Sequence, residues 1–396
     1  MSSPKSSGSY QALPAEQVFD WLDTESDQRA ARGQVRRLHP RAAETTGLDL
    51  AGNDYLGLAG DKRVAGAAAA AALRWGGPSS SRLATGTTET HIELERELAA
   101  FHGAAAALVF SSGLAANLGA VTALSGAESA IVADRHLHPS LADATRLSRA
   151  DVAAVTHADQ AATAHALATR RQQRALVVTD SVFGADGDLA PLPGLSTVCR
   201  QHGAALLVDD THGFGVLGEG GRGAVHEASL AAEPDIITTL DLSATLGVQG
   251  GAVLGPKRVI DHLVNTARSF VFDSALAPAD VAAARTALGI LRDEPDLPRH
   301  AANNAAALAE GLRAAGLRVG IPDAAIVSVH APGAEEAVSW AARCTSQGVG
   351  VSSDRPPVVP DGASRLRLAA RSDLGEQDIA TAVNTISETA PPGAHG

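Results

Sequence analysis

The clearest candidates for chemistry lie in the segment LLVDDTHGFGVLG, where two side chains suited to a planar ligand stand three residues apart. Asp209 ends an apolar run typical of a buried strand, and His212 follows it. A carboxylate in such a place can pair with a protonated ring nitrogen, and an imidazole nearby can stack on or hydrogen-bond a flat molecule. The same residues fit a turn-capping aspartate and a surface histidine. Ser181, in VTDSVFGADGD, fits either a ligand contact or a turn before Gly184.

The segment VFSSGLAANLG predicts a place for an anion, because a Ser-Ser-Gly turn joins an apolar strand to a helix. Backbone N–H groups at the start of a helix attract negative charge, so Ser112 and Gly113 are candidate binding residues. Without a ligand the segment is only a helix start. His136 and His138 follow the next apolar run. Histidines two residues apart after a strand place one ring in a cleft and the other outside it more readily than they form a metal site. We therefore predict no metal.

Seven short apolar runs divide the middle of the chain, and alanine-rich stretches with a helical pattern separate most of them. This alternation predicts an α/β fold with a mostly parallel sheet covered on both faces. The candidate side chains then meet at the carboxyl ends of the strands. The runs span residues 107–110, 130–133, 152–156, 175–179, 204–208, 235–238 and 251–254.

We predict three parts for the chain. Residues 1–50 form an N-terminal arm with a helix over 15–37, which has a partial apolar face among charged residues. Residues 51–280 form a large α/β domain. Residues 281–396 form a smaller α+β domain, in which helical patterns precede strand-like runs at 324–330 and 365–369.

Composition excludes several classes of protein. The 396 residues are 45% hydrophobic, enough for a large core, and the net charge of −12 argues against nucleic-acid binding. No apolar run is long enough to span a membrane, and the first residues lack the apolar core of a secretory signal, so we expect a cytoplasmic protein. Cys199 and Cys344 lie far apart and are read as ordinary thiols.

Nine motifs, taken in order from about residue 15 to 388, together resemble those of the α-oxoamine synthases. The motifs are LDLAGNDYLGL, SSSRLATGTTETHIELERELAAF, FSSGLAANLGA, HPSLADA, TDSVFGADGD, LLVDDTHGFGVLG, GVQGGAVLG, ARSFVFDSALAPA and RPPVVPDGASRLRL. The resemblance implies a fold-type-I, aminotransferase-like architecture with pyridoxal phosphate (PLP) as cofactor. It also implies homodimers that condense an amino acid with an acyl thioester and release carbon dioxide.

The resemblance gives roles to the polar residues at the strand ends. Asp209 matches the aspartate that pairs with the cofactor's pyridine nitrogen, and His138 matches the histidine that stacks on the ring. His212 and Ser181 match groups near its phenolic oxygen.

The family's substrate and subunit contacts also have counterparts here. Asn53 and Arg355 match residues that contact the substrate, with Arg355 as the clamp for its carboxylate. Residues 79–82 and 272–274 match segments that meet the partner subunit, so the resemblance implies a homodimer with a shared site.

One motif departs from the family pattern. Where the family turn reads roughly TLSKALG, this chain has TTLDLSATLG, with Asp241 in place of the threonine that touches the phosphate and Ala244 in place of the lysine that binds PLP covalently. The three lysines of the chain, Lys5, Lys62 and Lys257, lie elsewhere in the sequence. Further departures are Leu114, Pro139, Asp210 and Thr211.

Three interpretations follow from the missing lysine: an acyltransferase that works without PLP, a non-catalytic partner of an active synthase, and a homologue that binds PLP without a covalent bond. We favour the first, because a decayed scaffold would lose its other polar residues as readily as its lysine. His138, His212 and Asp209 then act as acid, base and orienter, and the Ser112 and Gly113 amides face an oxyanion or a carrier phosphate. The prediction is acyl transfer from acyl-CoA or acyl-carrier protein to a small-molecule amine, hydroxyl or carbon nucleophile, with no cofactor.

Overall fold

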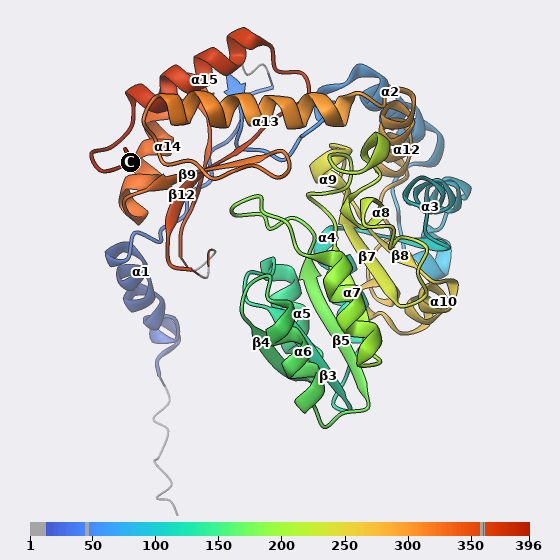
Figure 1. The fold of residues 1–396 in the computed structure, drawn as a ribbon. Helices are drawn as coiled ribbons and strands as arrows, with labels where there is room; N and C mark the ends of the chain where they lie inside the picture. The colour runs from blue at the N-terminus through green and yellow to red at the C-terminus, as the bar shows by residue number, and fades with distance from the viewer. Residues whose placement is uncertain (1–12, 44–46, 357–358, 360) are drawn as a thin grey trace, which may run out of the picture. The chain divides into compact units, whose positions relative to one another are not determined.

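The computed structural model describes residues 13–43, 47–356, 359 and 361–396, and it divides between Thr46 and Gly47 into two compact units (Figure 1). The first unit holds the 3₁₀ helix η1 (Ala15–Gln17) and α1 (Trp21–Ala31). The helix predicted over 15–37 therefore ends early. Gly33 explains the end, because its φ of 62° is left-handed, as at the carboxyl ends of many helices.

A seven-stranded sheet forms the centre of the second unit, in the order β2-β8-β7-β6-β5-β3-β4. Strand β8 runs antiparallel to β2 and β7, and the other neighbours are parallel. Each of the seven apolar runs forms one strand, so the predicted fold class is confirmed. The strands are β2 (Ala106–Phe110), β3 (Ser129–Asp134), β4 (Asp151–Val155), β5 (Arg174–Asp180), β6 (Ala205–Asp209), β7 (Ile236–Asp241) and β8 (Gly251–Gly255).

Helices cover both faces of this sheet because the strands are apolar on both sides. In β6, Leu207 packs into a core with α4, α5 and α10, while Leu206 and Val208 pack into another core with α6, α7 and α8. The helices on the first face are α4 (Gly113–Leu124), α5 (Pro139–Leu147), α10 (Lys257–Thr266) and α11 (Arg268–Val271). Those on the second are α6 (Gln160–Thr169), α7 (Leu192–Gln201) and α8 (Ala224–Glu227).

A third core anchors the turn that carries Ala244. Leu242 and Leu246, in and just after α9 (Leu242–Thr245), are buried among side chains of three longer helices. These are α2 (Lys62–Trp75), α3 (Glu89–His102) and α12 (Pro278–Asp293). Short helical turns η2 (Leu58–Gly60), η3 (Arg82–Gly86) and η4 (Glu219–Gly221) complete this part of the chain.

The C-terminal segment has its own three-stranded antiparallel sheet, ordered β11-β12-β9, with α13 and α15 running beside it (Figure 1). Trp340 of α14 is fully buried and donates its indole N–H to the Ile386 carbonyl of α15, which ties the two helices together. The three-domain division of the chain stays a prediction. The elements are β9 (Ile326–Ala331), β11 (Ser352–Asp354), β12 (Ser364–Ala369), α13 (Leu297–Ala314), α14 (Ala334–Ser346), α15 (Glu376–Glu388), and the parallel pair β1 (Leu48–Asp49) and β10 (Val349–Gly350).

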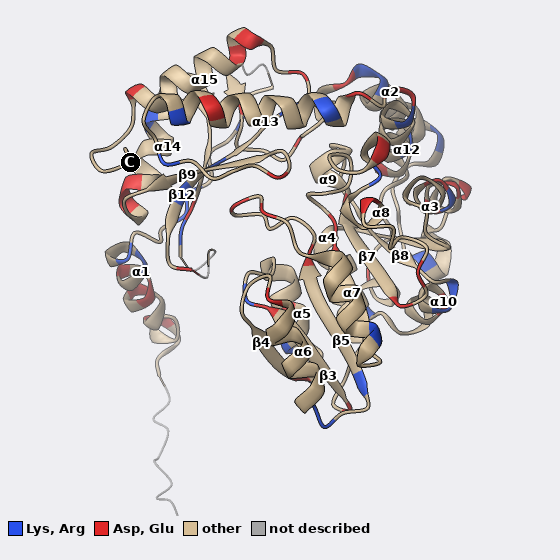
Figure 2. Cartoon of the chain, in the orientation of Figure 1, with Lys and Arg blue, Asp and Glu red and all other residues tan. Residues whose placement is uncertain are grey.

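Acidic and basic residues both occur along α13 and around α3 (Figure 2). Among the described residues, no helix has the length and apolarity needed to cross a membrane. Within the same ranges, no group of three or more His, Cys, Asp or Glu side chains is placed to hold a metal ion. Cys199 and Cys344 are buried free thiols, as expected.

Candidate active site

Three neighbouring strands end in aspartates at one edge of the central sheet. Asp180, Asp209 and Asp241 are the last residues of β5, β6 and β7, and Asp180 is the register partner of Asp209. Burial, and then the neighbouring Asp209, raise the pKa of Asp180 well above its usual value, which favours the protonated form of that carboxyl group. Its Oδ2 accepts the His138 backbone N–H at 3.0 Å.

Asp209 is buried and held by two donors. Its Oδ2 accepts from Asn117 Nδ2 at 2.7 Å, and its Oδ1 accepts from the Thr211 backbone N–H at 3.0 Å. Because Asn117 lies on α4, the carboxylate is fixed between its own strand and the helix that covers it. Sequence reasoning predicted Asp209 and missed Asn117, which lies in the quoted FSSGLAANLGA motif.

His138 is joined to Asp209 through a chain of hydrogen bonds. Asn117 Nδ2 also donates to Ser140 Oγ at 2.8 Å, and Ser140 Oγ lies 2.6 Å from His138 Nδ1. The Ser140 backbone N–H points at the same ring nitrogen, which caps α5 with Pro139 at its first position. With Nδ1 accepting, a neutral His138 carries its proton on Nε2 and can present it to a ligand.

His212 belongs to a separate cluster. Its Nδ1 lies 2.8 Å from the hydroxyl of Tyr55, and Arg367 Nη2 donates to that hydroxyl at 3.2 Å. Burial, together with the nearby Arg367 and His138, lowers the pKa of His212 well below its ordinary value, so the ring is neutral. Asp209, predicted to orient a catalytic histidine, makes no recorded hydrogen bond to His212, because the two side chains bond to different partners within the described structure.

The sequence did not mark Tyr55 and Arg367 as site residues, although both stand in quoted motifs. Tyr55 is fully buried, and Arg367 also donates through Nε to the Gly184 carbonyl at 2.5 Å. Arg367 therefore ties β12 of the C-terminal segment to the loop after β5. Alternation along β12 was the available signal, since it places the Arg365 and Arg367 side chains on the same face.

Ser181 has a different partner from the one expected. Its hydroxyl donates to Asp210 Oδ1 at 2.5 Å, and Asp210 also accepts the backbone N–H groups of Ala224 and Val225. Burial raises the pKa of Asp210 to about 7. The hydroxyl predicted to face a ligand is therefore engaged with a buried carboxyl group, and its role toward a ligand stays a prediction.

Asp241 and Thr211, both departures from the family pattern, contact each other. The Asp241 backbone N–H donates to Thr211 Oγ1 at 2.8 Å, and Asp241 Oδ1 accepts the Ser243 N–H at 2.8 Å, which caps α9. The Asp241 side chain lies over Gly113, where an added Cβ would be 2.7 Å from its Oδ2. The carboxylate thus occupies the space beside the turn that starts α4.

Ala244 is buried in α9, and the described lysines lie apart from it. Lys62 is the first residue of α2, and Lys257 is the first residue of α10, where its ammonium pairs with Asp261 at 2.7 Å. Lys5 lies outside the described residues. Neither described lysine therefore belongs to α9, the turn that holds Ala244.

The two residues predicted to bind the substrate are Asn53 and Arg355. The Oδ1 of Asn53 is buried and has no hydrogen-bond partner among the described residues, and the same holds for Oδ1 of Asn117. A ligand N–H or O–H group at these oxygens would remove the cost of leaving them unpaired. Arg355 follows β11 and donates to Ser353 Oγ at 3.4 Å, and its carboxylate-binding role stays a prediction.

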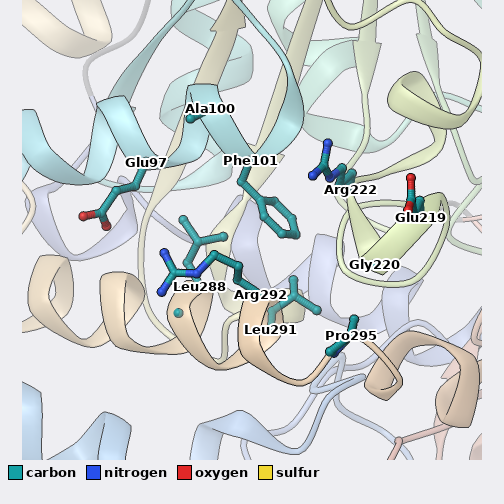
Figure 3. Close-up of a pocket in the computed structure, with 11 residues that line it drawn as sticks. Glu97, Ala100, Phe101, Glu219, Gly220, Arg222, Leu288, Leu291, Arg292 and Pro295 are labelled. Atoms are coloured by element: carbon teal, nitrogen blue, oxygen red, sulfur yellow. The ribbon is translucent and has the colours of Figure 1, made fainter.

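A cavity of about 370 Å³ lies elsewhere, between the end of α3, the end of α12 and the 219–222 segment. Figure 3 shows Phe101, Leu291 and Pro295 around it with Arg222 and Arg292 at its sides. The guanidinium carbon of Arg222 lies 5.9 Å from the centre of the Phe101 ring. This cavity shares no lining residue with the site at the strand ends.

Known proteins of similar sequence and fold agree with the resemblance. Residues 45–386 match the model for aminotransferase class I and II. The 8-amino-7-oxononanoate synthase of Mycobacterium sp. (strain KMS) is 53% identical over 369 residues, which cover 93% of this chain and 96% of that protein.

Two solved structures of serine palmitoyltransferase have nearly the same fold. A lysine-to-alanine variant of the enzyme from S. paucimobilis with a bound PLP–myriocin aldimine has a TM-score of 0.87 at 28% identity, over 95% of this chain and 98% of that one. A second structure, with a PLP internal aldimine, has a TM-score of 0.86 at 28% identity and the same coverage.

These relatives correct two predictions. An acyltransferase that works without PLP, and a chain with no cofactor, are both wrong, because relatives with 53% identity are 8-amino-7-oxononanoate synthases and the structural neighbours hold PLP. The error came from reading the retained polar residues, in the absence of the lysine, as a site for chemistry without PLP, when they are equally the residues that would hold PLP. The lysine-to-alanine variant with bound PLP shows that, in that protein, losing a lysine leaves PLP able to bind.

The residues at the strand ends fit PLP in part. Asp209 fits the ring nitrogen, because it is a buried carboxylate already oriented by Asn117 and Thr211, and the unpaired amide oxygen of Asn117 offers a further acceptor beside it. Ala244 does not fit a covalent bond to the chain. The arrangement therefore suits the ring of the cofactor without a link to a lysine.

The identity with known synthases extends over almost the entire length of both proteins, and the fold agrees with it. The family is one of enzymes that transfer acyl groups. On the evidence of its motifs, its sheet and these relatives, the chain belongs to the α-oxoamine synthase family within aminotransferase class I and II.

Proposed function

We propose that this chain is a transferase that condenses an amino acid with an acyl thioester, and that it uses PLP held without a covalent bond to the protein. The observation that carries the proposal is the hydrogen-bonded chain from Asp209 through Asn117 and Ser140 to His138. The chain links a carboxylate that can pair with the cofactor's ring nitrogen to an imidazole that can stack on the face of the ring. This fixed orientation of two ligand-binding groups supports a protein that binds PLP over one that serves only as a scaffold.

PLP, when bound, supplies an electron sink for the carbon next to the amino acid's carboxylate. The protein's own residues bind and orient. Asp209 would accept a hydrogen bond from the protonated ring nitrogen and so favour its positive charge, and His138 would offer its Nε2–H to the ligand. His212, neutral and fixed by Tyr55, offers Nε2 toward Gly184, where an added Cβ would lie 3.0 Å away.

The proposed substrates follow from the chemistry of the family and from two residues of this chain that could bind them. Arg355 is the candidate for the amino acid's carboxylate, which a guanidinium binds through two parallel hydrogen bonds. Asn53, with its unpaired buried oxygen, is the candidate for a ligand N–H or O–H group. Acyl-CoA and acyl-carrier protein both supply the thioester chemistry, and the acceptor is a small amino acid.

The assembly is proposed to be a homodimer. The segments 79–82 and 272–274, matched to subunit contacts in the family, include or adjoin apolar side chains that are exposed in the single chain. Phe272 is 72% exposed, and Leu83 and Leu114 are also exposed. A second copy of the chain would cover these side chains.

A thiol-release assay tests this function. The protein is incubated with acyl-CoA donors of short, medium and long chain and a panel of amino acids, with and without PLP. We expect thiol release that needs both PLP and an amino acid, and at least about a hundredfold loss in Asp209→Ala, as for other groups that stabilise a developing charge. Equal release without PLP, or no release with any pair of substrates, contradicts the proposal.

A further inference from the structure

We propose that Asp241 fills the anion subsite at the start of α4, so that the site binds a pyridoxal ring without gaining affinity from its phosphate. This inference rests on the proposed function, because it concerns the same ligand at the same strand ends. It assigns Asp241 and Thr211 a role in selecting the ligand.

The subsite is the turn from Ser111 to Gly113. Ser112 caps α4 by accepting the Ala115 N–H at 3.1 Å, and α4 is twelve residues long, so its first N–H groups face an anion with the full effect of a helix N-terminus. On one side the backbone of β8 lies close, since a Cβ on Gly251 would be 2.6 Å from the Gly113 nitrogen. The β8 backbone therefore leaves no room for a ligand where it meets the turn.

The Asp241 side chain lies at the same turn, against Gly113. A Cβ on Gly113 would lie 2.6 Å from the Asp241 Cβ, 2.9 Å from its Cγ and 2.7 Å from its Oδ2. The carboxylate thus stands over the first residue of α4, 128 positions earlier in the chain, where an external anion would approach. A negative charge fixed in this place interacts favourably with the positive end of the α4 dipole and competes with an external anion for it.

Three contacts hold Asp241 there. Its backbone N–H donates to Thr211 Oγ1, its Oδ1 accepts the Ser243 N–H, and its Cβ packs on Gly113. Thr211 replaces the alanine of the family pattern, which has no hydroxyl to accept that N–H. The two departures are therefore parts of one arrangement, because the hydroxyl at 211 fixes the backbone that presents the carboxylate at 241.

A second carboxylate lies at the same turn. Asp273 accepts the hydroxyl hydrogen of Ser111, which places another negative charge beside the subsite. A phosphate dianion arriving within about 4 Å of a carboxylate is repelled even at the dielectric constant of water, and more strongly in a cleft. Phosphate contacts to the helix are thereby offset by repulsion from Asp241 and Asp273.

The test compares the dissociation constants of PLP and of pyridoxal, which has no phosphate, by ligand fluorescence. Wild type, Asp241→Asn and Asp241→Thr are measured, with Asp61→Asn as the matched control, because Asp61 caps α2 in the same way. Asparagine keeps the shape and the cap of Asp241 and removes only its charge. Thermal unfolding of each variant confirms that it is folded.

We expect wild type to bind PLP no more tightly than pyridoxal. Both changes at Asp241 then strengthen PLP binding at least about tenfold, leave pyridoxal binding within about threefold, and have no counterpart in Asp61→Asn. The inference is overturned if the dissociation constant of wild type is tenfold lower for PLP than for pyridoxal. It is also overturned if the Asp241 variants bind PLP with the dissociation constant of wild type.

The same data separate this inference from the proposed function. Pyridoxal binding to wild type that is lost in Asp209→Ala supports the ring site whatever Asp241 does. If PLP binds to the Asp241 variants and not to wild type, the role of Asp241 is supported. If neither PLP nor pyridoxal binds to any folded variant, both proposals are overturned.

Discussion

At the scale of single residues, the candidate site combines one oriented carboxylate with two groups whose pKa values burial shifts toward the neutral form. Burial raises the pKa of Asp180 well above its ordinary value and lowers that of His212 well below its own. Asp209 lies between them and accepts hydrogen bonds from Asn117 and Thr211. In the proposed function the cationic ring nitrogen of PLP meets the oriented carboxylate of Asp209, and His212, with its lowered pKa, is a neutral hydrogen-bonding group.

Tyr55→Phe tests the anchoring of His212. The change removes the hydroxyl that joins His212 Nδ1 to Arg367, and it leaves a buried ring nitrogen without its partner. We expect a loss of about 1 to 3 kcal/mol in the free energy of unfolding, measured by urea denaturation. Ser339→Ala on the exposed face of α14 is the control and should change it by less than about 0.5 kcal/mol. Equal effects of the two changes would show that Tyr55 does not anchor His212.

The raised pKa of Asp210 leads to a prediction for how the free energy of unfolding depends on pH. Its pKa is about 7 in the folded protein and near 3.8 when unfolded, so between these values the folded state holds a proton that the unfolded state has lost. Its contribution to stability therefore falls as pH rises from about 4 to 7 and is constant above that range. Relative to Asp210→Asn, the unfolding free energy of wild type should fall by at least about 1 kcal/mol between pH 4.5 and 7. Parallel curves for the two proteins would contradict this.

At the scale of elements, the seven strands were predictable because each is a short apolar run bounded by polar residues, and the order of motifs predicted which strand ends carry chemistry. The antiparallel direction of β8 was not predictable from its composition. Contacts such as Tyr55–His212 and Arg367–Gly184 join residues more than 150 positions apart, so no local pattern reveals them. The role of the Thr211 hydroxyl could not be predicted from the sequence either, because the group it accepts from is the backbone N–H of Asp241, at the end of another strand.

The turn between β2 and α4 gives a prediction at this scale. Gly113→Ala places a methyl group 2.6 Å from the Asp241 Cβ, so it should destabilise the protein by about 1 to 3 kcal/mol. Asp241→Gly removes the side chain that clashes, and in the double variant the cost of Gly113→Ala should shrink by at least about 1 kcal/mol. Gly66→Ala in α2 is the control, because nothing lies near its added Cβ and alanine favours the helix. Additive effects of the two changes would contradict the packing of Asp241 on Gly113.

At the scale of the whole molecule, the chain retains the fold of enzymes that hold PLP while its own turn lacks the lysine. The sequence predicted this architecture correctly and the absence of a cofactor wrongly. The difference has a physical reason: the fold depends on many apolar positions, whereas cofactor binding depends on a few contacts of which the covalent bond is only one. Asp209, Asn117 and His138 are the residues proposed to make the others.

The proposed homodimer predicts the behaviour of the whole molecule in solution. Light scattering at micromolar concentration should give twice the mass of one chain. Phe272→Glu should raise the dimer dissociation constant at least about tenfold, because it puts a charge in an apolar contact. Ile321→Glu is the control, since Ile321 is 77% exposed and lies in the C-terminal segment. A monomeric wild type, or equal effects of the two changes, would refute the shared site.

A crystal structure of the protein grown with PLP and an amino acid tests the central claim most directly. The account predicts the pyridine nitrogen within about 2.7 to 3.2 Å of an Asp209 carboxylate oxygen, the His138 ring against the ligand, and no bond between PLP and any lysine of the chain. PLP bound covalently to a lysine, or bound away from Asp209 with the carboxylate still held only by Asn117 and Thr211, would contradict it.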